Sequence, residues 1–419
     1  MGKYQKHPLR ANRVAVLRGL LRSYGRARRT FAQILSAEVK SRLALAKARR
    51  YGDAKRDPRT PPSLAHRLAE LEVPADVYHS LIAQARKHLH LAHRWSRLRK
   101  RALGLERLTS YDNTPLGAKI DQRYSYAQAQ RLVERALRPL GKRYLRHWRR
   151  GMRPGSGWVD VLPSRGKYPQ NYLLGAPGMP HPFLLLNFRG DHQSLLLYAH
   201  EGGHAMHSFF SQRHQAGPQG STERFLDEVA SQTNECLVSA YLLRQARTPE
   251  ARLAYLARAA GQFAGKVFRM AYYAELELAI HQHVERHDGI TAKALDTLNL
   301  KLLRRYAGHH QGARAVTKEW RNSWAWIPHL YRSFKLFRYA TSFVTAHALA
   351  ERILRKGFGP SYVKRFLSAG SSKEPMVLLR ELAVDLRGGG AYTAAFAQLA
   401  RYLDAIEALL RRRGRRPGR

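Results

Sequence analysis

The residues with the clearest chemical pattern are His200, Glu201 and His204, which form an H-E-x-x-H motif within LLLYAHEGGHAMHSFF. A helix turns once about every 3.6 residues, so the two imidazoles lie one turn apart on one face and can bind a single metal ion. Glu201 lies beside them without being a ligand, and it can take a proton from a water that the ion activates. The motif therefore predicts a zinc site with hydrolytic chemistry. The alternative is a core helix whose histidines make ordinary hydrogen bonds and whose glycines allow close helix packing.

A third ligand must come from another element, because catalytic zinc usually takes three protein ligands. The downstream stretch STERFLDEVASQTNECLVSAYLL predicts a second helix, which Ser221 or Thr222 would cap. On this helix we predict Glu228 as the third ligand, with Asp227 and Glu235 as candidates for orienting the imidazoles by hydrogen bonds. A single Glu on a helix is usually a solvated charge, so Glu228 takes this interpretation only from the motif that precedes it.

The two stretches AHEGGHAMHS and FLDEVASQTNE, with 24 positions from His204 to Glu228, resemble the oligoendopeptidase F family of zinc peptidases, relatives of thimet oligopeptidase. The resemblance extends from about residue 20 to about residue 410 and includes LGLERLTSYDNTPL, GWVDV, HPFLLLNF, WIPHLYRSFKLFRYATSF and FLSAGSSKEPMVLLRELAVDL. It implies a cytosolic endopeptidase of short peptides, mainly α-helical with a small β-sheet and a deep channel. It also implies that His200, His204 and Glu228 hold one Zn²⁺ and that Glu201 is the general base.

The late stretch WIPHLYRSFKLFRYATSF carries the remaining catalytic candidates. The resemblance implies that His329, with Tyr339 and Tyr331, helps to hold the substrate and the oxyanion that a tetrahedral intermediate develops. Lys335 and Phe337 stand where family members commonly carry tyrosines. Three interpretations stay open: Lys335 replaces a phenol as donor, Tyr331 or Tyr339 suffices, or turnover is weak.

Two apolar stretches have structural explanations as well. Helix core packing is expected for Phe334 and Phe337 and is the alternative for Tyr331. The stretch PFLLLNF, residues 182–188, is predicted to be a short strand. In zinc peptidases of this kind such a strand is an edge, with which an extended peptide could pair its backbone. The alternative is a buried structural strand.

The composition limits where the protein acts. A single cysteine, Cys236, excludes an intramolecular disulfide and fits a reducing compartment. The first residues, MGKYQKHPLR, are basic and polar and do not resemble a secretory signal. No stretch approaches the length of apolar sequence that a membrane-spanning helix needs. We therefore expect a cytoplasmic protein that does not act in a membrane, and the sequence leaves its oligomeric state open.

Residues 1–105 are predicted to be a shortened N-terminal helical lobe, residues 106–410 the catalytic domain, and residues 411–419 a basic, disordered tail. Members of the family usually have more chain before the motif helix. We therefore expect a more open cleft, or a chain that needs a partner to complete itself. An inactive fragment that lacks one lobe is a further alternative.

The formal net charge is +44, from 74 Lys and Arg against 30 Asp and Glu. Such a charge attracts polyanions. This supports a rival function: a catalytically weakened peptidase scaffold that associates with nucleic acid. We expect instead that most of the charge lies on solvated helix faces, because no nucleic-acid motif accompanies it. Histidines such as His281, His283, His309 and His310 could suggest a second metal, but we expect paired surface histidines.

Overall fold

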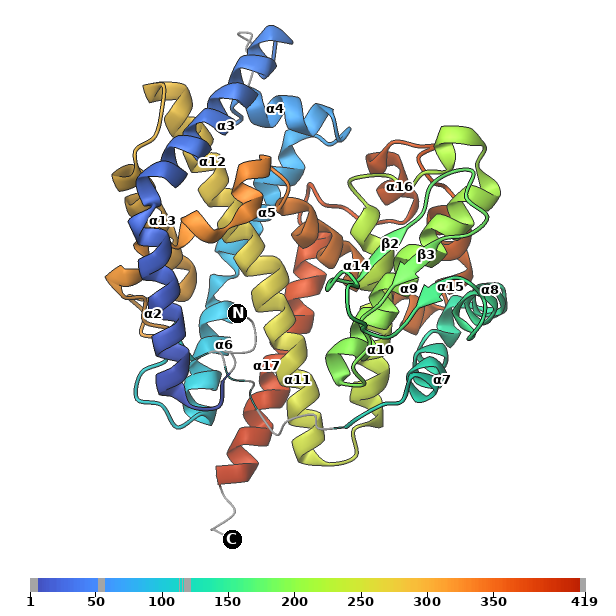
Figure 1. Cartoon of the computed structure of the whole chain (residues 1–419). Coiled ribbons are helices and arrows are strands. Elements are labelled where there is room, and N and C mark those ends of the chain that lie inside the picture. Colours follow the sequence, from blue (N-terminus) through green and yellow to red (C-terminus); the bar gives the residue numbers. More distant parts are fainter. Residues whose placement is uncertain (1–6, 52–56, 113, 115, 117–121, 415–419) are drawn as a thin grey trace. The chain divides into compact units, whose positions relative to one another are not determined.

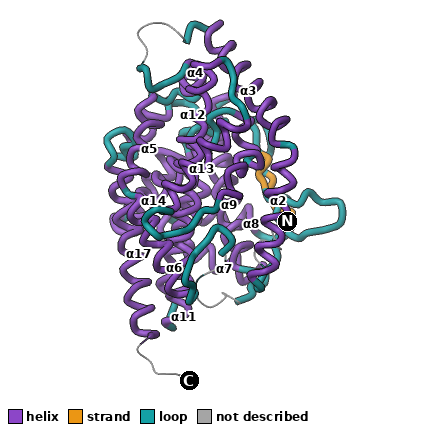
Figure 2. Tube along the Cα trace, turned by 90° about the vertical axis from the view of Figure 1, so that its left-hand side faces the viewer, coloured by secondary structure: helices purple, strands orange, loops and turns teal. Residues whose placement is uncertain are grey.

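The computed structural model describes residues 7–51, 57–112, 114, 116 and 122–414. The chain divides by its packing into two compact units. Unit 1 comprises residues 1–117, 256–340 and 396–419, and unit 2 comprises residues 118–255 and 341–395. Helices dominate both units and strands are few (Figures 1 and 2). The predicted fold class, mainly α with a small β-sheet, is confirmed.

Unit 1 is built from helices and short helical turns. Its elements are α2 (Arg10–Arg26), α3 (Arg28–Ala48), α4 (Pro62–Ala69), α5 (Ala75–Lys87), α6 (Leu89–Ala102), η3 (Ala264–Phe268), α12 (Arg269–His287), α13 (Ala292–Ala307), η4 (Lys318–Trp326) and η5 (Pro328–Arg332). Their apolar residues recur at helical spacing, and one of the resulting clusters joins Leu17 and Leu21 of α2 to Trp320 of η4.

Unit 2 holds the H-E-x-x-H motif. Its elements are α7 (Tyr126–Ala136), η1 (Arg138–Leu140), α8 (Lys142–Met152), β1 (Val159–Asp160), β2 (Tyr172–Leu174), β3 (Phe183–Leu185), α9 (His192–His214), η2 (Gly217–Gly220), α10 (Asp227–Gln245), α15 (Gly359–Tyr362), η6 (Val363–Leu367) and α16 (Pro375–Glu381). Three further helices have residues in both units: α11 (Pro249–Phe263), α14 (Phe337–Lys356) and α17 (Gly390–Gly414).

The stretch PFLLLNF forms a strand, as predicted, but the expectation of an edge strand is wrong. The sheet has the order β1-β3-β2, so β3 is its central strand. Both β3 and β2 pack against α9 (Figure 1). Leu184 of β3 pairs with Val159 in the parallel direction and with Leu173 in the antiparallel direction. The backbone of β3 is therefore already paired on both sides. Its apolar pattern reveals burial but not its neighbours, which are very short strands in a Gly- and Pro-rich region.

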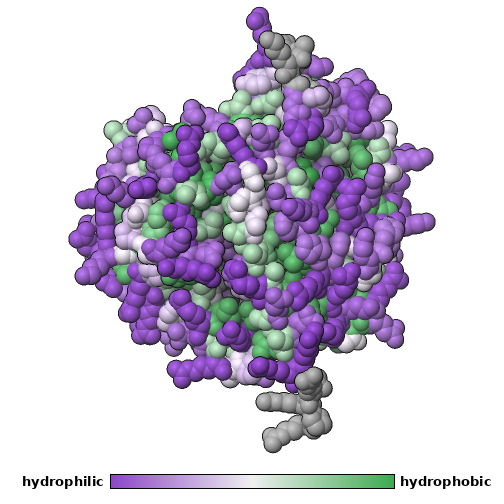
Figure 3. Space-filling model, turned by 180° about the vertical axis from the view of Figure 1, so that it is seen from behind, coloured by the Kyte–Doolittle hydropathy of each residue, from purple (hydrophilic) through white to green (hydrophobic). Residues whose placement is uncertain are grey.

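In α8 the arginines lie on the solvent face of the helix. Tyr144, Leu145 and Trp148 are buried, while Arg143, Arg146, Arg149 and Arg150 are exposed. Hydrophilic residues accordingly cover most of the face in Figure 3, with small hydrophobic areas between them. This distribution is the one expected for solvated charge. Within the described residues, no helix combines the length and the apolar character needed to span a bilayer.

The predicted domain boundaries near residues 105 and 410 stay a prediction, because packing does not test which part acts as a catalytic domain. Part of the predicted tail has a defined structure: α17 continues to Gly414, so residues 411–414 are helical rather than disordered. Apolar residues recur along α17 up to residue 410, and the helix continues into the basic segment that begins at residue 411. Residues 415–419 lie outside the described part of the chain.

Candidate metal centre and active site

The two helices that carry the motif residues begin at different kinds of cap. Asp191 caps α9, and its carboxylate accepts a hydrogen bond of 2.7 Å from the Ser194 N–H. The predicted caps of α10 are wrong, because this helix begins at Asp227 instead of near Ser221 or Thr222. The side chain of Glu223 accepts hydrogen bonds from the Phe225 and Leu226 N–H groups and closes a turn there. This turn places Glu228 in the first turn of α10.

The two glycines of the motif allow close packing on two sides. A Cβ on Gly203 would lie 2.6 Å from the Cα of Ser231 in α10, and a Cβ on Gly202 would lie 2.4 Å from the ring of Trp148 in α8. Backbone atoms of α9 and α10 therefore nearly touch at the level of the motif. Asn234 adds a hydrogen bond of 3.1 Å to the Ala199 carbonyl. These contacts fix the register of the helix that supplies His200 and His204 against the one that supplies Glu228.

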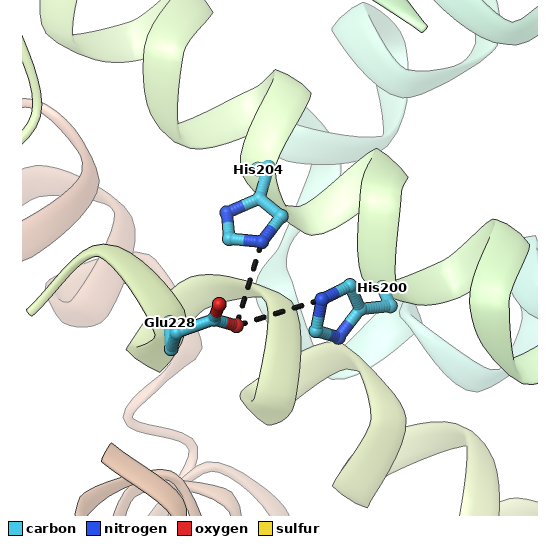
Figure 4. Close-up of side chains that lie close together, drawn as sticks. All are labelled: His200, His204 and Glu228. Carbon is cyan, nitrogen blue, oxygen red and sulfur yellow. Dashed lines mark ion pairs between the residues drawn. The ribbon is translucent and has the colours of Figure 1, made fainter. Parts of the chain in front are cut away.

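His200 and His204 of α9 point toward Glu228 of α10 (Figure 4). Glu228 Oε2 lies 3.5 Å from His200 Nε2 and 3.5 Å from His204 Nε2. One ligand atom from each residue lies within 4.8 Å of the others. All three side chains are partly buried, between 18% and 19% exposed. Within the described residues this is the one cluster of three or more such side chains with metal-binding geometry.

Glu235 lies seven residues, about two helical turns, beyond Glu228 and orients one imidazole. Its Oε1 lies 2.6 Å from His200 Nδ1, which leaves Nε2 facing Glu228. Such a carboxylate fixes the tautomer and the ring orientation of a ligating histidine. Ser231 donates a hydrogen bond of 3.1 Å to Glu228 Oε2. Burial alone would raise the pKa of Glu228, but His204, His200 and Ser231 hold it at about 2.

Glu201 is 6% exposed and lies next to His200 on α9. Burial raises the pKa of Glu201 above its ordinary value, although the neighbouring His200 and His204 lower it in part. Burial would lower the pKa of His204, but the hydrogen bond and the charge of Glu228, with the charges of Glu201 and Asp227, raise it. A carboxyl group with a raised pKa is suited to accept and return a proton near neutral pH.

The candidates from the late stretch lie in unit 1, whereas the metal cluster lies in unit 2. They do not share one helix. His329 and Tyr331 lie in η5, and Tyr339 is the third residue of α14. The ring centroids of His329 and Tyr339 are 6.3 Å apart with their planes at 90°. Burial raises the pKa of Tyr331 to about 12, and its hydroxyl donates a hydrogen bond of 3.4 Å to a backbone carbonyl.

The two departures from the family pattern have different surroundings. Phe337 is fully buried and its ring centroid lies 5.1 Å from that of Tyr78, so core packing explains it, as it does the fully buried Phe334. Lys335 is partly exposed. Burial lowers the pKa of His329, and the charges of Lys335 and Arg332 lower it further. His329 is therefore neutral near neutral pH, with a cation close by.

Sequence reasoning overlooked two residues and misplaced a third. Asn234 within α10 and Glu223 in the turn before it hold the two helices in place, and only their polar character among apolar neighbours could have marked them. His281 is not a surface histidine: it is 2% exposed and its Nδ1 lies 2.7 Å from Ser63 Oγ. His207, three residues after His204, is also buried, and burial lowers its pKa to about 3.

Comparison with known proteins shows the family of this chain. Residues 3–398 match the family described as peptidase family M3. The chain belongs to peptidase family M3. The chain is also similar to oligopeptidase PepF of Bacillus subtilis (33% identity, covering 93% of this chain and 56% of that protein) and to group B oligopeptidase PepB of Streptococcus agalactiae (31%, covering 93% and 62%).

A solved structure resembles this M3 chain as well. It is the oligoendopeptidase-F of Enterococcus faecium, with a TM-score of 0.76, 27% identity and coverage of 98% of this chain and 66% of that one. The predicted resemblance to the oligoendopeptidase F family is thus confirmed. The chain spans between 56% and 66% of the length of these relatives.

Proposed function

We propose that this chain carries the active site of a zinc-dependent endopeptidase that hydrolyses short peptides. The observation that carries the proposal is the convergence of His200 Nε2, His204 Nε2 and Glu228 Oε2, with Glu201 adjacent on the same helix. Membership of peptidase family M3 and the similarity to proteins named oligopeptidases support peptide substrates.

The donor set fits a zinc ion. Two imidazole nitrogens and one carboxylate oxygen are a common ligand set for catalytic zinc, with a fourth position open. Ligand atoms at about 2.0–2.2 Å from a tetrahedral ion lie about 3.3–3.6 Å apart. The two measured separations from Glu228 Oε2, 3.5 Å each, agree with such an arrangement. The interaction of Glu235 with His200 supplies the support that ligating histidines usually have.

The roles of the protein groups follow from their chemistry. A bound zinc ion supplies Lewis-acid chemistry, polarising a carbonyl and acidifying a water molecule. Glu201 accepts the proton of the attacking water and delivers it to the leaving amine, for which its raised pKa is suitable. His329 and Tyr339, with Tyr331 as a further candidate, donate hydrogen bonds to the developing oxyanion. Glu235 keeps the Nε2 of His200 directed at the ligand position.

Replacement of Glu201 by Gln tests the proposal. We expect Glu201→Gln to retain zinc, measured by elemental analysis, and to lose about 10²–10⁴-fold in kcat/KM on a quenched fluorescent peptide. The matched control is Glu134→Gln, which removes a carboxylate from a surface ion pair with Arg149 in the same unit and should leave activity unchanged. Full activity of Glu201→Gln would rule out this mechanism.

The family match does not favour the rival function, a weakened peptidase scaffold that binds polyanions. A salt titration distinguishes the two. Tight, steeply salt-dependent binding to generic DNA or RNA without chelator-sensitive peptide cleavage would support the rival.

A further inference from the structure

The turn between His329 and Tyr339 has an unusual backbone. It connects η5 to α14, and its residues Ser333 and Phe334 have φ angles of 20° and 55°. Residues other than glycine rarely adopt positive φ, so two in succession need support from their surroundings. The turn brings the rings of His329 and Tyr339 to within 6.3 Å, although ten positions separate them in the sequence.

Phe334 provides the contact between this turn and the interior of unit 1. Its side chain is fully buried, with ring centroids 5.8 Å from Tyr78 of α5 and 4.2 Å from His281 of α12. Its N–H donates a hydrogen bond of 2.5 Å to Oε1 of Glu277, also on α12. This bond satisfies a buried backbone donor at the point where the backbone is least regular.

Glu277 differs from the other buried carboxylate on its helix. Glu275 pairs with Arg86, Arg305 and Tyr306. Glu277 is 2% exposed, and within the described residues its single hydrogen bond is the one from Phe334, since Oε2 has no partner. Burial raises the pKa of Glu277 to about 8, so the carboxyl group is mainly protonated at neutral pH. A buried polar group without further partners is unfavourable for folding, which indicates another use.

We propose that Glu277 is a positioning residue: by accepting the Phe334 N–H at Oε1, it fixes the turn at Ser333 and Phe334 and so sets the placement of His329 and Tyr339. The proposal deepens the function proposed above and rests on it, because it assumes that His329 and Tyr339 act on the substrate. A hydrogen-bond acceptor is required here, not a charge, since the protonated carboxyl and an amide both present an oxygen to the N–H.

Hydrogen–deuterium exchange of residues 328–340 tests whether Glu277 fixes the turn, independently of catalysis. Glu277→Leu keeps a similar volume but leaves the Phe334 N–H without an acceptor, so we expect exchange at least about tenfold faster. Glu277→Gln keeps the acceptor and should exchange like the wild type. The matched control Glu275→Gln changes a buried carboxylate on the same helix and should leave this segment unchanged. Unaltered exchange in Glu277→Leu, or equally fast exchange in Glu277→Gln, overturns the proposal.

Kinetics then test whether the turn acts through His329 and Tyr339. We expect Glu277→Leu to lower kcat about tenfold with little change in KM, Glu277→Gln to restore it, and Glu277→Leu to have no further effect in a background that carries both His329→Ala and Tyr339→Phe. An undiminished effect in that background overturns the positioning role. If His329→Ala alone leaves kcat unchanged, the assigned function of His329 fails, while the exchange data still decide whether Glu277 holds the turn. Should Glu277→Leu not fold, Glu277→Asp shortens the acceptor and gives the same comparison.

Discussion

Two regions of the molecule hold the proposed catalytic side chains by different means. In unit 2, His200, His204 and Glu228 project from two regular helices whose backbones nearly touch at Gly203. In unit 1, His329 and Tyr339 flank an irregular turn whose φ angles are positive and whose N–H is held by one buried carboxyl group. The first arrangement follows from helix geometry and spacing. The second depends on the tertiary contacts of a single residue, Phe334, so single substitutions should affect the two regions very differently.

The largest effect is expected at Gly203, where the two helices that carry the metal cluster pack closely. A Cβ there would lie 2.6 Å from a backbone atom of α10, which no side-chain movement can relieve. We expect Gly203→Ala to separate α9 from α10, to abolish stoichiometric zinc binding and to destabilise the protein by about 1–3 kcal/mol. The control is Gly261→Ala, a helical glycine with no atom within 4 Å of the added Cβ. Normal zinc content in Gly203→Ala would contradict the close-packing explanation.

The next largest effect concerns the turn and depends on pH. Burial raises the folded-state pKa of Glu277 from 4.5 to about 8, with Arg67 the one charge that lowers it and Tyr78 and His281 as neighbouring titratable groups. Because the folded state binds this proton more tightly than the unfolded state, its contribution to stability is full below the unfolded pKa. That contribution is lost as pH rises toward about 8.

Glu277→Gln has no such proton, so its unfolding free energy should not show this loss. A pKa difference of one is worth about 1.4 kcal/mol, so the wild type should lose a few kcal/mol relative to Glu277→Gln between about pH 5 and about pH 8. Denaturant unfolding of both proteins across this range measures the difference. Parallel curves would mean that Glu277 is not buried as a neutral acid.

A smaller effect is expected at Glu235, which orients His200. Removing an orienting carboxylate typically lowers metal affinity about 10–100-fold. We expect Glu235→Gln to bind zinc more weakly by this factor in a competition with a chromophoric chelator, and to recover activity at high zinc concentration. Loss of activity that excess zinc does not restore would assign Glu235 another role.

The smallest effect is expected at Tyr339. Tyr339→Phe keeps the ring contact with His329 and removes one hydroxyl, so we expect kcat to fall about tenfold, as for the loss of one neutral hydrogen bond, with zinc content unchanged. Tyr331→Phe serves as the comparison, because the Tyr331 hydroxyl has a backbone acceptor, which reduces its availability to a substrate. An equal loss of kcat in Tyr339→Phe and Tyr331→Phe would contradict a distinct role of the Tyr339 hydroxyl at the oxyanion.

The metal cluster could be predicted from the sequence because its information is local. The spacing of His200 and His204 fixes a shared helical face, and Glu228, Ser231 and Glu235 follow at intervals of three and four on a second helix. Even so, the predicted start of α10 is wrong. The side chain of Glu223 accepts hydrogen bonds from two backbone N–H groups and closes a turn that no capping pattern reveals.

The rest depends on contacts between distant residues. The central position of β3 depends on two partner strands of two and three residues, which are too short to give a pattern. The turn at Ser333 and Phe334 is set by Glu277, 57 positions earlier in the chain, and a helical pattern across residues 326–343 conceals it. Its positive φ angles occur without a glycine that would have indicated them.

The glycines of the H-E-G-G-H helix also bear on how such sites are recognised in sequences. Gly202 and Gly203 occupy the two positions that the motif leaves unspecified, yet one faces the ring of Trp148 and the other the backbone of α10. For this chain, a description that scores only the histidines and the glutamate would accept sequences whose ligands could never meet. The packing at those two positions leaves no room for a side chain. A search pattern for related sites should therefore require both small residues together with the aromatic partner in α8.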